Sequence, residues 1–204
     1  MSTPGAGPRR SSVQVRRLLL PGVVWAAILF AAPFLNDDGG EALLWGAGAA
    51  VLVSLFPWAL VTILDRRGDL RRGLNRLGAP PVILGAAGAC FMVLRVIRWT
   101  DGPRALAAVV FAMITAYALT AAFAKVIRLD WADVTCAASA VVLPVLLFLL
   151  FPGAAGIAAA LAAAALFIAA LLSGKARTAR STAGAAAAGV VSAGIFVWLL
   201  QYSV

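Results

Sequence analysis

Histidine is absent from this chain of 204 residues. Its absence removes the commonest general base, the commonest side-chain ligand of metals and a common nucleophile for phosphoryl transfer. Acidic residues are also scarce, with only eight in total. Catalysis through a phosphohistidine is therefore excluded, and close pairs of carboxylates become the most informative polar feature of the sequence.

Cysteine is nearly absent too. The two cysteines that occur, Cys90 and Cys136, lie within or beside apolar runs and have no metal-ligand spacing. We interpret both as small hydrophobic residues and expect no disulfide.

Charge is low for a folded chain: charged residues make up 12% of the sequence and hydrophobic residues 63%. About a quarter of a soluble domain is charged, so this composition excludes that class. A helix needs about 20 apolar residues to cross a bilayer. Seven apolar runs reach or approach that length: Leu18–Leu35, Ala42–Leu64, Pro80–Ile97, Ala105–Ala124, Val134–Phe151, Ala154–Leu172 and Ala183–Leu200. We predict an all-α polytopic membrane bundle of seven transmembrane helices.

Residues 1–17 differ from the rest of the chain, because they contain prolines, serines and four arginines but no long apolar run. We expect a disordered basic leader here and a single transmembrane domain over residues 18–204. The first apolar run is long and lacks a clear small-residue cleavage site, so we favour a retained first span over a signal peptide.

Cationic residues are distributed unevenly between the predicted loops. With the N-terminus in the cytoplasm, 14 of the 17 lysines and arginines face inward, and Arg95, Arg98 and Arg104 face outward. This bias follows the positive-inside rule and predicts that orientation in the plasma membrane. The net charge of +9 is thus a property of the loops, and we expect no nucleic-acid partner.

Three predicted inner loops, at residues 65–80, 125–133 and 174–182, carry much of this charge. Ionisable residues at the mouth of a membrane bundle are functional candidates, and guanidinium groups bind phosphate oxygens in a forked geometry. We predict one polar pocket whose phosphate ligands are Arg66, Arg67, Arg71, Arg72, Arg76, Lys125, Arg128, Lys175, Arg177, Arg180 and Ser181. The alternative is a set of solvated basic loops that only determine topology.

The order and spacing of these loops resemble the type 2 phosphatidic acid phosphatase superfamily, in particular its small bacterial membrane members. Its motifs are a lysine followed after six residues by Arg-Pro; Pro-Ser-Gly-His; and Ser-Arg followed by His and Asp. Here Arg72 and Ala79-Pro80 stand for the first motif, Leu129–Ala132 for the second, and Gly174-Lys175 with Ser181 for the third. The resemblance implies a helical bundle with a phosphate pocket, but this chain lacks the histidines of the family's hydrolysis.

Asp130 and Asp133 replace the serine and histidine of that family's second motif. Two carboxylates repel a bare phosphate unless a divalent cation intervenes, and magnesium binds carboxylates together with substrate phosphates. Their three-residue spacing points both side chains the same way on a helix, and Asp65 and Asp69 offer a second pair. We predict a magnesium site of Asp65, Asp69, Asp130 and Asp133, with Asp130 and Asp133 as the catalytic residues.

The predicted substrate is an isoprenoid or lipid diphosphate, whose departure leaves an allylic carbocation for cyclisation, elimination or transfer. Two alternatives stay open: a non-catalytic protein that binds a lipid phosphate or a membrane partner, and a divergent lipid phosphatase. The aspartates also have a structural interpretation, in which they pair with Lys125 or Arg128 and hold the fourth and fifth spans together.

Local features predict how the spans pack. Arg95 and Arg98 are expected to extend to the membrane interface beside Trp99. Pro152-Gly153 predicts a tight turn that makes the fifth and sixth spans an antiparallel hairpin. Small residues at the start of the last span favour close helix packing. Three polar residues of the fourth span are expected to hydrogen-bond to neighbouring helices: Thr115, Tyr117 and Thr120.

Overall fold

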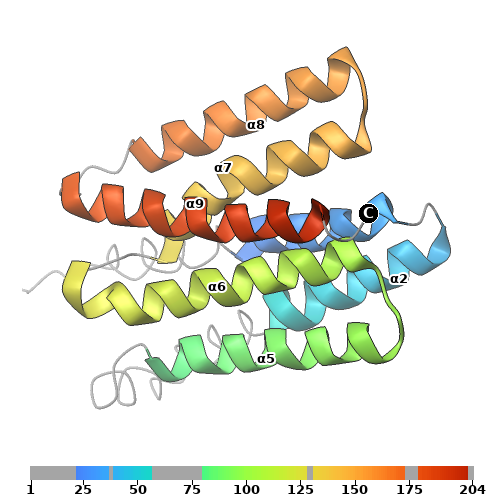
Figure 1. Ribbon diagram of the computed structural model, residues 1–204, viewed down its shortest axis with the longest axis horizontal. Coiled ribbons are helices and arrows are strands. Elements are labelled where there is room, and N and C mark those ends of the chain that lie inside the picture. The colour runs from blue at the N-terminus through green and yellow to red at the C-terminus, as the bar shows by residue number, and fades with distance from the viewer. Residues whose placement is uncertain (1–21, 37–38, 57–79, 128–130, 173–178, 202–204) are drawn as a thin grey trace, which may run out of the picture.

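Each of the seven apolar runs contains a helix in the computed structural model, which describes residues 22–36, 39–56, 80–127, 131–172 and 179–201 (Figure 1). The chain is all-helical over these residues. In chain order the elements are the first helix (Gly22–Leu35), which ends in the 3-10 turn η1 (Ala32–Leu35), then α2 (Gly40–Ala49) with its π-helical continuation η2 (Ala50–Leu55), α5 (Pro80–Trp99), α6 (Arg104–Ile127), α7 (Trp131–Leu150), α8 (Ala154–Leu172) and α9 (Ala179–Gln201).

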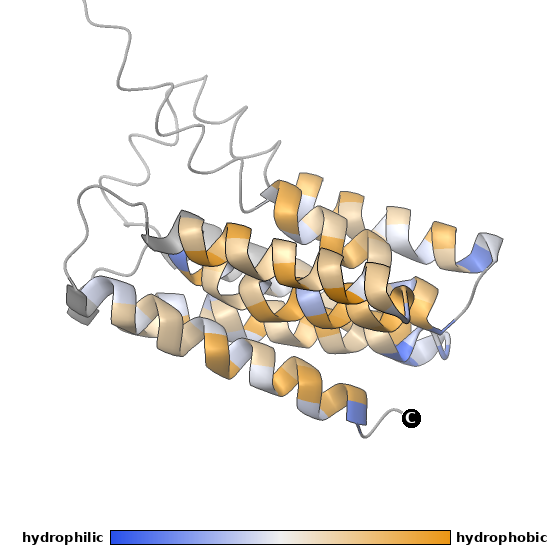
Figure 2. Ribbon diagram, turned by 90° about the horizontal axis from the view of Figure 1, so that it is seen from above, coloured by the Kyte–Doolittle hydropathy of each residue, from blue (hydrophilic) through white to orange (hydrophobic). Residues whose placement is uncertain are grey.

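Three of these helices contain a stretch that is long and apolar enough to cross a membrane: Arg104–Phe123, Asp133–Leu150 and Ser181–Gln201. Apolar residues dominate along the helices, and the most hydrophilic residues lie near helix ends (Figure 2). These features indicate a multi-pass membrane protein, which confirms the predicted helical membrane fold at that level. The predicted leader, residues 1–17, lies outside the described residues, so the division into leader and domain stays a prediction.

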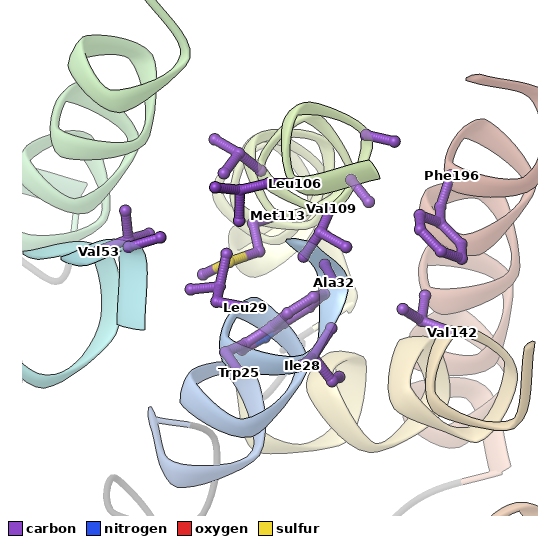
Figure 3. Packing of buried hydrophobic residues seen from close by; sticks show 14 of the residues in the cluster. Trp25, Ile28, Leu29, Ala32, Val53, Leu106, Val109, Met113, Val142 and Phe196 are labelled. Atoms are coloured by element: carbon purple, nitrogen blue, oxygen red, sulfur yellow. The ribbon is translucent and has the colours of Figure 1, made fainter. Parts of the chain in front are cut away.

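One face of the first helix packs into the main core of the bundle (Figure 3). Its buried residues recur every three or four positions, so they form one face of the helix: Trp25, Ile28, Leu29 and Ala32. This face belongs to one core cluster with side chains from six other elements, among them Val53 of η2, Leu106, Val109 and Met113 of α6, Val142 of α7 and Phe196 of α9. The first helix therefore packs against helices that are far apart in the sequence.

Two hydrogen bonds orient the first helix against its neighbours. The indole Nε1 of Trp25 donates to Thr135 Oγ1 of α7 at 3.3 Å. The hydroxyl of Ser54 in η2 donates to the backbone oxygen of Gly22 at 2.5 Å. Because a buried donor without an acceptor is costly, these bonds restrict how the first helix can rotate or slide.

Two hydroxyls of α6 bond within their own helix. Thr115 Oγ1 donates to Phe111 O at 3.0 Å, and Thr120 Oγ1 donates to Ala116 O at 2.7 Å. The prediction of bonds to neighbouring helices was therefore wrong for these threonines. In an apolar setting the carbonyl of the preceding turn is the nearest acceptor, and a hydroxyl that bonds to it needs no partner helix.

Helices α7 and α9 cross at close range over small residues. A Cβ atom added to Gly189 of α9 would lie 2.4 Å from Ala137 Cβ of α7. Two carbon atoms that are not bonded to each other cannot approach so closely. Ala188, next to Gly189, and Ala185, one turn earlier, are buried in a cluster with Val134. The predicted close packing of the last span through small residues is confirmed.

The turn between α5 and α6 is defined by backbone bonds and covered by α2. The Gly102 N–H donates to Ile97 O at 2.8 Å, and Asp101 has a left-handed φ of 49°, as in a Schellman cap. The ring of Trp45 lies over Gly102, where an added Cβ would be 2.9 Å from a ring atom. This turn is therefore packed against the rest of the bundle.

The side chain of Asn36 caps α6, although it lies 69 positions from the amide that it caps. Its Oδ1 accepts a hydrogen bond from the Ala105 N–H at 2.9 Å, which satisfies one of the free amides in the first turn of α6. We expect Asn36→Ala to destabilise the protein by about 1 kcal/mol, measured as a lower midpoint of thermal unfolding in lipid nanodiscs. Asn36→Asp keeps an acceptor and is the control, so an equal loss in both variants would refute the cap.

The hairpin of α7 and α8 turns at residues 151–153, where Gly153 has a φ of 116° that favours glycine. This confirms the predicted turn. Helix α8 lies at the edge of the bundle against α7 (Figure 1). Phe167 of α8 packs on Cys136 and Ala137, and both cysteines of the chain are buried, in agreement with their interpretation as small hydrophobic residues.

Candidate functional site

The two ends of the bundle differ in what they carry. The described turns 100–103 and 151–153 and the last residues of α9 lie at one end (Figure 1), which we call the Trp99 end. The helix ends that flank residues 57–79, 128–130 and 173–178 lie at the other, which we call the Asp133 end. The predicted cationic loops therefore connect helices at the Asp133 end, although most of their residues lie outside the described ones.

Asp133 is the most informative described residue of the predicted site. It lies in the first turn of α7, and its side chain is only 1% exposed. A carboxylate in the first turn is stabilised by the positive end of the helix dipole. A buried ionisable group in a membrane bundle is costly to desolvate, so such residues are functional candidates.

Helices α6, α7 and α9 converge next to Asp133. Val134 forms a buried cluster with Ala116 of α6 and with Ala185 and Ala188 of α9. Ser181, a predicted phosphate ligand, is partly buried and lies one turn before Ala185 in the first turn of α9. The structure therefore places Asp133 and Ser181 in the first turns of two packed helices, at the same end of the bundle.

Two polar residues near this end were missed by the sequence analysis as site residues. Thr120 of α6 and Thr135 of α7 are buried, and Thr135 accepts the hydrogen bond of the Trp25 indole. Thr135 lies two positions after Asp133, so the two side chains point to different sides of α7. Both threonines lie inside an apolar run close to a charged segment, and this sequence pattern could have indicated them.

The other predicted site residues lie beyond what the structure describes. Lys125 belongs to α6 and Arg180 to α9, but the positions of their side chains are not described. The remaining ones fall in the segments 57–79, 128–130 and 173–178: Asp65, Arg66, Arg67, Asp69, Arg71, Arg72, Arg76, Arg128, Asp130, Lys175 and Arg177. Their roles stay predictions.

The magnesium prediction can be compared with the described residues only in part. Within them, no group of three or more histidine, cysteine, aspartate or glutamate residues is close enough to hold a metal ion. Asp133 is the one member of the predicted set Asp65, Asp69, Asp130 and Asp133 whose side chain is described. Its oxygens are ligands of the kind that magnesium prefers, but its burial leaves little of it open to solvent.

The chemistry available at the Asp133 end follows from these groups. The amino-terminal ends of α7 and α9 both point there, and the positive end of a helix favours anions. Asp133 can accept hydrogen bonds or hold a cation, and the hydroxyl of Ser181 can donate to an anion. Comparison with known proteins adds nothing to this description, because no family model, no curated protein and no solved structure matches the chain.

Proposed function

We propose that this protein is a multi-pass plasma-membrane protein, with its N-terminus in the cytoplasm, that binds an isoprenoid or lipid diphosphate at the Asp133 end. The observation that supports this most directly is a carboxylate that is 1% exposed where three membrane helices converge. The cation-rich segments of the sequence adjoin that end. Arginine and lysine side chains there supply the positive charge that a diphosphate needs.

The fuller proposal includes chemistry on the bound lipid. Asp65, Asp69, Asp130 and Asp133 are the carboxylates that would hold magnesium. A magnesium ion held by these residues would neutralise the diphosphate and make it a better leaving group. The arginines orient the phosphate oxygens, and the apolar walls of the bundle keep water away from the lipid chain. The bundle follows the phosphatidic acid phosphatase pattern in this proposal, without that family's histidine mechanism.

A non-catalytic role is the second candidate, and the burial of Asp133 favours it. A carboxylate enclosed between packed helices can hold the amino-terminal ends of α7 and α9 together without touching a substrate. In that case the cationic segments bind a lipid phosphate or a membrane partner, and no bond of the ligand is broken.

Binding is tested with the full-length protein in phosphatidylcholine nanodiscs and radiolabelled geranylgeranyl diphosphate, with magnesium or with EDTA. With magnesium present, we expect Asp133→Asn to weaken binding about tenfold or more, because a neutral amide is a poorer ligand than a carboxylate for the cation that would join Asp133 to the diphosphate. Asp101→Asn is the matched control, since Asp101 lies in the turn at the Trp99 end, where asparagine also adopts the left-handed backbone. Equal weakening by both variants, or none by Asp133→Asn, would refute the proposed site.

Release of pyrophosphate from the same samples separates the two candidates. The enzyme is supported if pyrophosphate release requires magnesium and is lost in Asp130→Ala. That variant must still bind the intact diphosphate in buffer without EDTA. Tight binding with no pyrophosphate and no hydrocarbon product supports the non-catalytic role.

A further inference from the structure

The Trp99 end carries three arginines that the topology does not require. Arg95, Arg98 and Arg104 flank the turn between α5 and α6. They are the cations that the positive-inside distribution leaves on the opposite side from the other 14. Positive charge on that side opposes the predicted orientation, so its concentration at one turn calls for a separate explanation.

Helix α5 exposes both apolar and cationic side chains on its outer surface. It packs into the bundle through Cys90 and Ile97, which are buried. Around them, exposed apolar residues precede exposed arginines and an exposed tryptophan along the helix: Phe91, Met92, Arg95, Val96, Arg98 and Trp99. Along the helix, apolar residues are thus followed by cationic and aromatic ones, as in a helix that runs from the acyl chains of a bilayer to its headgroups.

Arg95 is held in a defined position. Its guanidinium carbon lies 5.2 Å from the centre of the Trp99 ring. This is a cation–π contact between two residues that are one helical turn apart. A guanidinium that stacks by its face keeps its N–H donors at the edge, where they can form paired hydrogen bonds to phosphate oxygens. The predicted placement of Arg95 beside Trp99 is confirmed, and its extension to the membrane interface stays a prediction.

Arg98 adds a second charge on the same part of the helix. It lies in the last turn of α5, where the negative end of the helix dipole attracts cations. The dipole explains Arg98 but not Arg95, which lies one turn earlier. Within the part of the chain that the structure describes, neither arginine forms an ion pair with a carboxylate.

We propose that this face of α5 binds an anionic phospholipid of the leaflet at the Trp99 end. The lipid phosphate bridges Arg95 and Arg98, and its acyl chains lie along Phe91, Met92 and Val96. A rise of about 1.5 Å per residue places Phe91 about 6 Å deeper than Arg95, which is the direction in which the chains extend. The proposal requires that the protein is embedded in a membrane, but not that a diphosphate binds at the Asp133 end.

The test compares lipid retention by native mass spectrometry. Full-length protein is released from nanodiscs of phosphatidylcholine and phosphatidylglycerol, and bound phosphatidylglycerol is counted. Each arginine at a membrane surface contributes about fivefold in affinity for anionic lipid, so Arg95→Gln with Arg98→Gln is expected to lower affinity about 30-fold. The control is Arg16→Gln with Arg17→Gln, which removes the same charge from the N-terminal leader.

The outcomes are distinguishable. Loss of phosphatidylglycerol in the α5 double variant but not in the leader variant supports the proposal, provided that both unfold at the wild-type temperature in pure phosphatidylcholine. Equal retention by the two double variants overturns it. Displacement of the lipid by soluble glycerol phosphate at equal concentration also overturns it, because the acyl chains would then contribute nothing.

A second measurement locates the lipid. The part of the tryptophan fluorescence that disappears in Trp99→Phe is assigned to Trp99, and brominated lipids quench a fluorophore only at short range. Brominated phosphatidylglycerol is expected to quench this component more strongly than brominated phosphatidylcholine at the same mole fraction. Equal quenching by the two lipids would mean that Trp99 meets the bilayer without selecting the headgroup, which contradicts the proposal.

Discussion

Replacing Trp25 by alanine is expected to destabilise the protein by about 3 kcal/mol. Trp25 is 1% exposed and belongs to the main core cluster, which joins side chains of several helices. The unfolded reference state in a bilayer is also apolar, so little of the loss comes from transfer out of water. Most of it comes from the dispersion contacts of the cavity walls and from the lost hydrogen bond to Thr135.

Two further variants separate these contributions, each measured by thermal unfolding in nanodiscs. Trp25→Phe keeps an aromatic ring but loses the N–H donor, so we expect a smaller loss of about 1 kcal/mol. Trp198→Ala removes an indole that is 55% exposed on α9 and is expected to have little effect. If Trp25→Ala and Trp198→Ala lose the same stability, the Trp25 face of the first helix is not buried in the core.

Gly189→Ala is expected to destabilise the protein by about 1–3 kcal/mol, although alanine is the better helix former. The added methyl group would lie 2.4 Å from Ala137 Cβ and 2.7 Å from backbone atoms of α7, so the two helices must move apart. Gly194→Ala is the matched control on the same helix, because a Cβ there meets no atom within 4 Å. We expect that variant to be as stable as the wild type or slightly more so.

The measurable result is the change in the midpoint of thermal unfolding. We expect it to fall for Gly189→Ala and to stay the same or rise slightly for Gly194→Ala. Combining Gly189→Ala with Ala137→Gly moves the methyl group from one helix to the other and should restore part of the loss. The recovery is only partial, because backbone atoms of α7 also lie close to the new methyl group. If Gly189→Ala and Gly194→Ala shift stability equally, the close crossing of α7 and α9 does not occur in the bilayer.

This crossing matters for the candidate site because it brings the first turns of α7 and α9 together. Asp133 and Ser181 each precede the crossing by about one or two turns. A variant that separates the helices at Gly189 is therefore expected to weaken diphosphate binding as well as stability. The Asp133→Asn variant, in contrast, tests binding without adding volume to the interface.

The site was predictable from the sequence only where charge is unusual for its position. Asp133 and Ser181 stood out because polar residues beside long apolar runs are rare, and both occupy first turns at one end of the bundle. Trp25, Thr120 and Thr135 did not stand out. Their hydrogen-bond partners are set by the packing and cannot be read from the sequence. Trp25 donates to Thr135 of another helix, and the hydroxyl of Thr120 donates to the carbonyl of Ala116 in its own helix.

The cap of α6 was equally beyond sequence analysis. Asn36 lies 69 positions from Ala105, and a cap is normally sought among the residues immediately before the helix. Here Pro103 and Arg104 precede the capped amide, and neither offers the acceptor. Only the packing of the first loop against the α5–α6 turn brings the acceptor into position.

The amino-acid sequence by itself determined which stretches form helices, because apolar length is a local property, although α6 and α9 extend a few residues beyond their apolar runs. It also determined that the protein belongs in a membrane, since the composition cannot support a soluble surface. Tertiary structure alone decided that one face of the first helix is buried in the core, that α8 lies at the edge and that α7 crosses α9 at Gly189. The physical reason is that these helices are apolar on nearly every side, so hydrophobicity does not distinguish a buried face from one that faces lipid. Packing is then selected by side-chain volume and by a few hydrogen bonds between residues that are far apart in the chain.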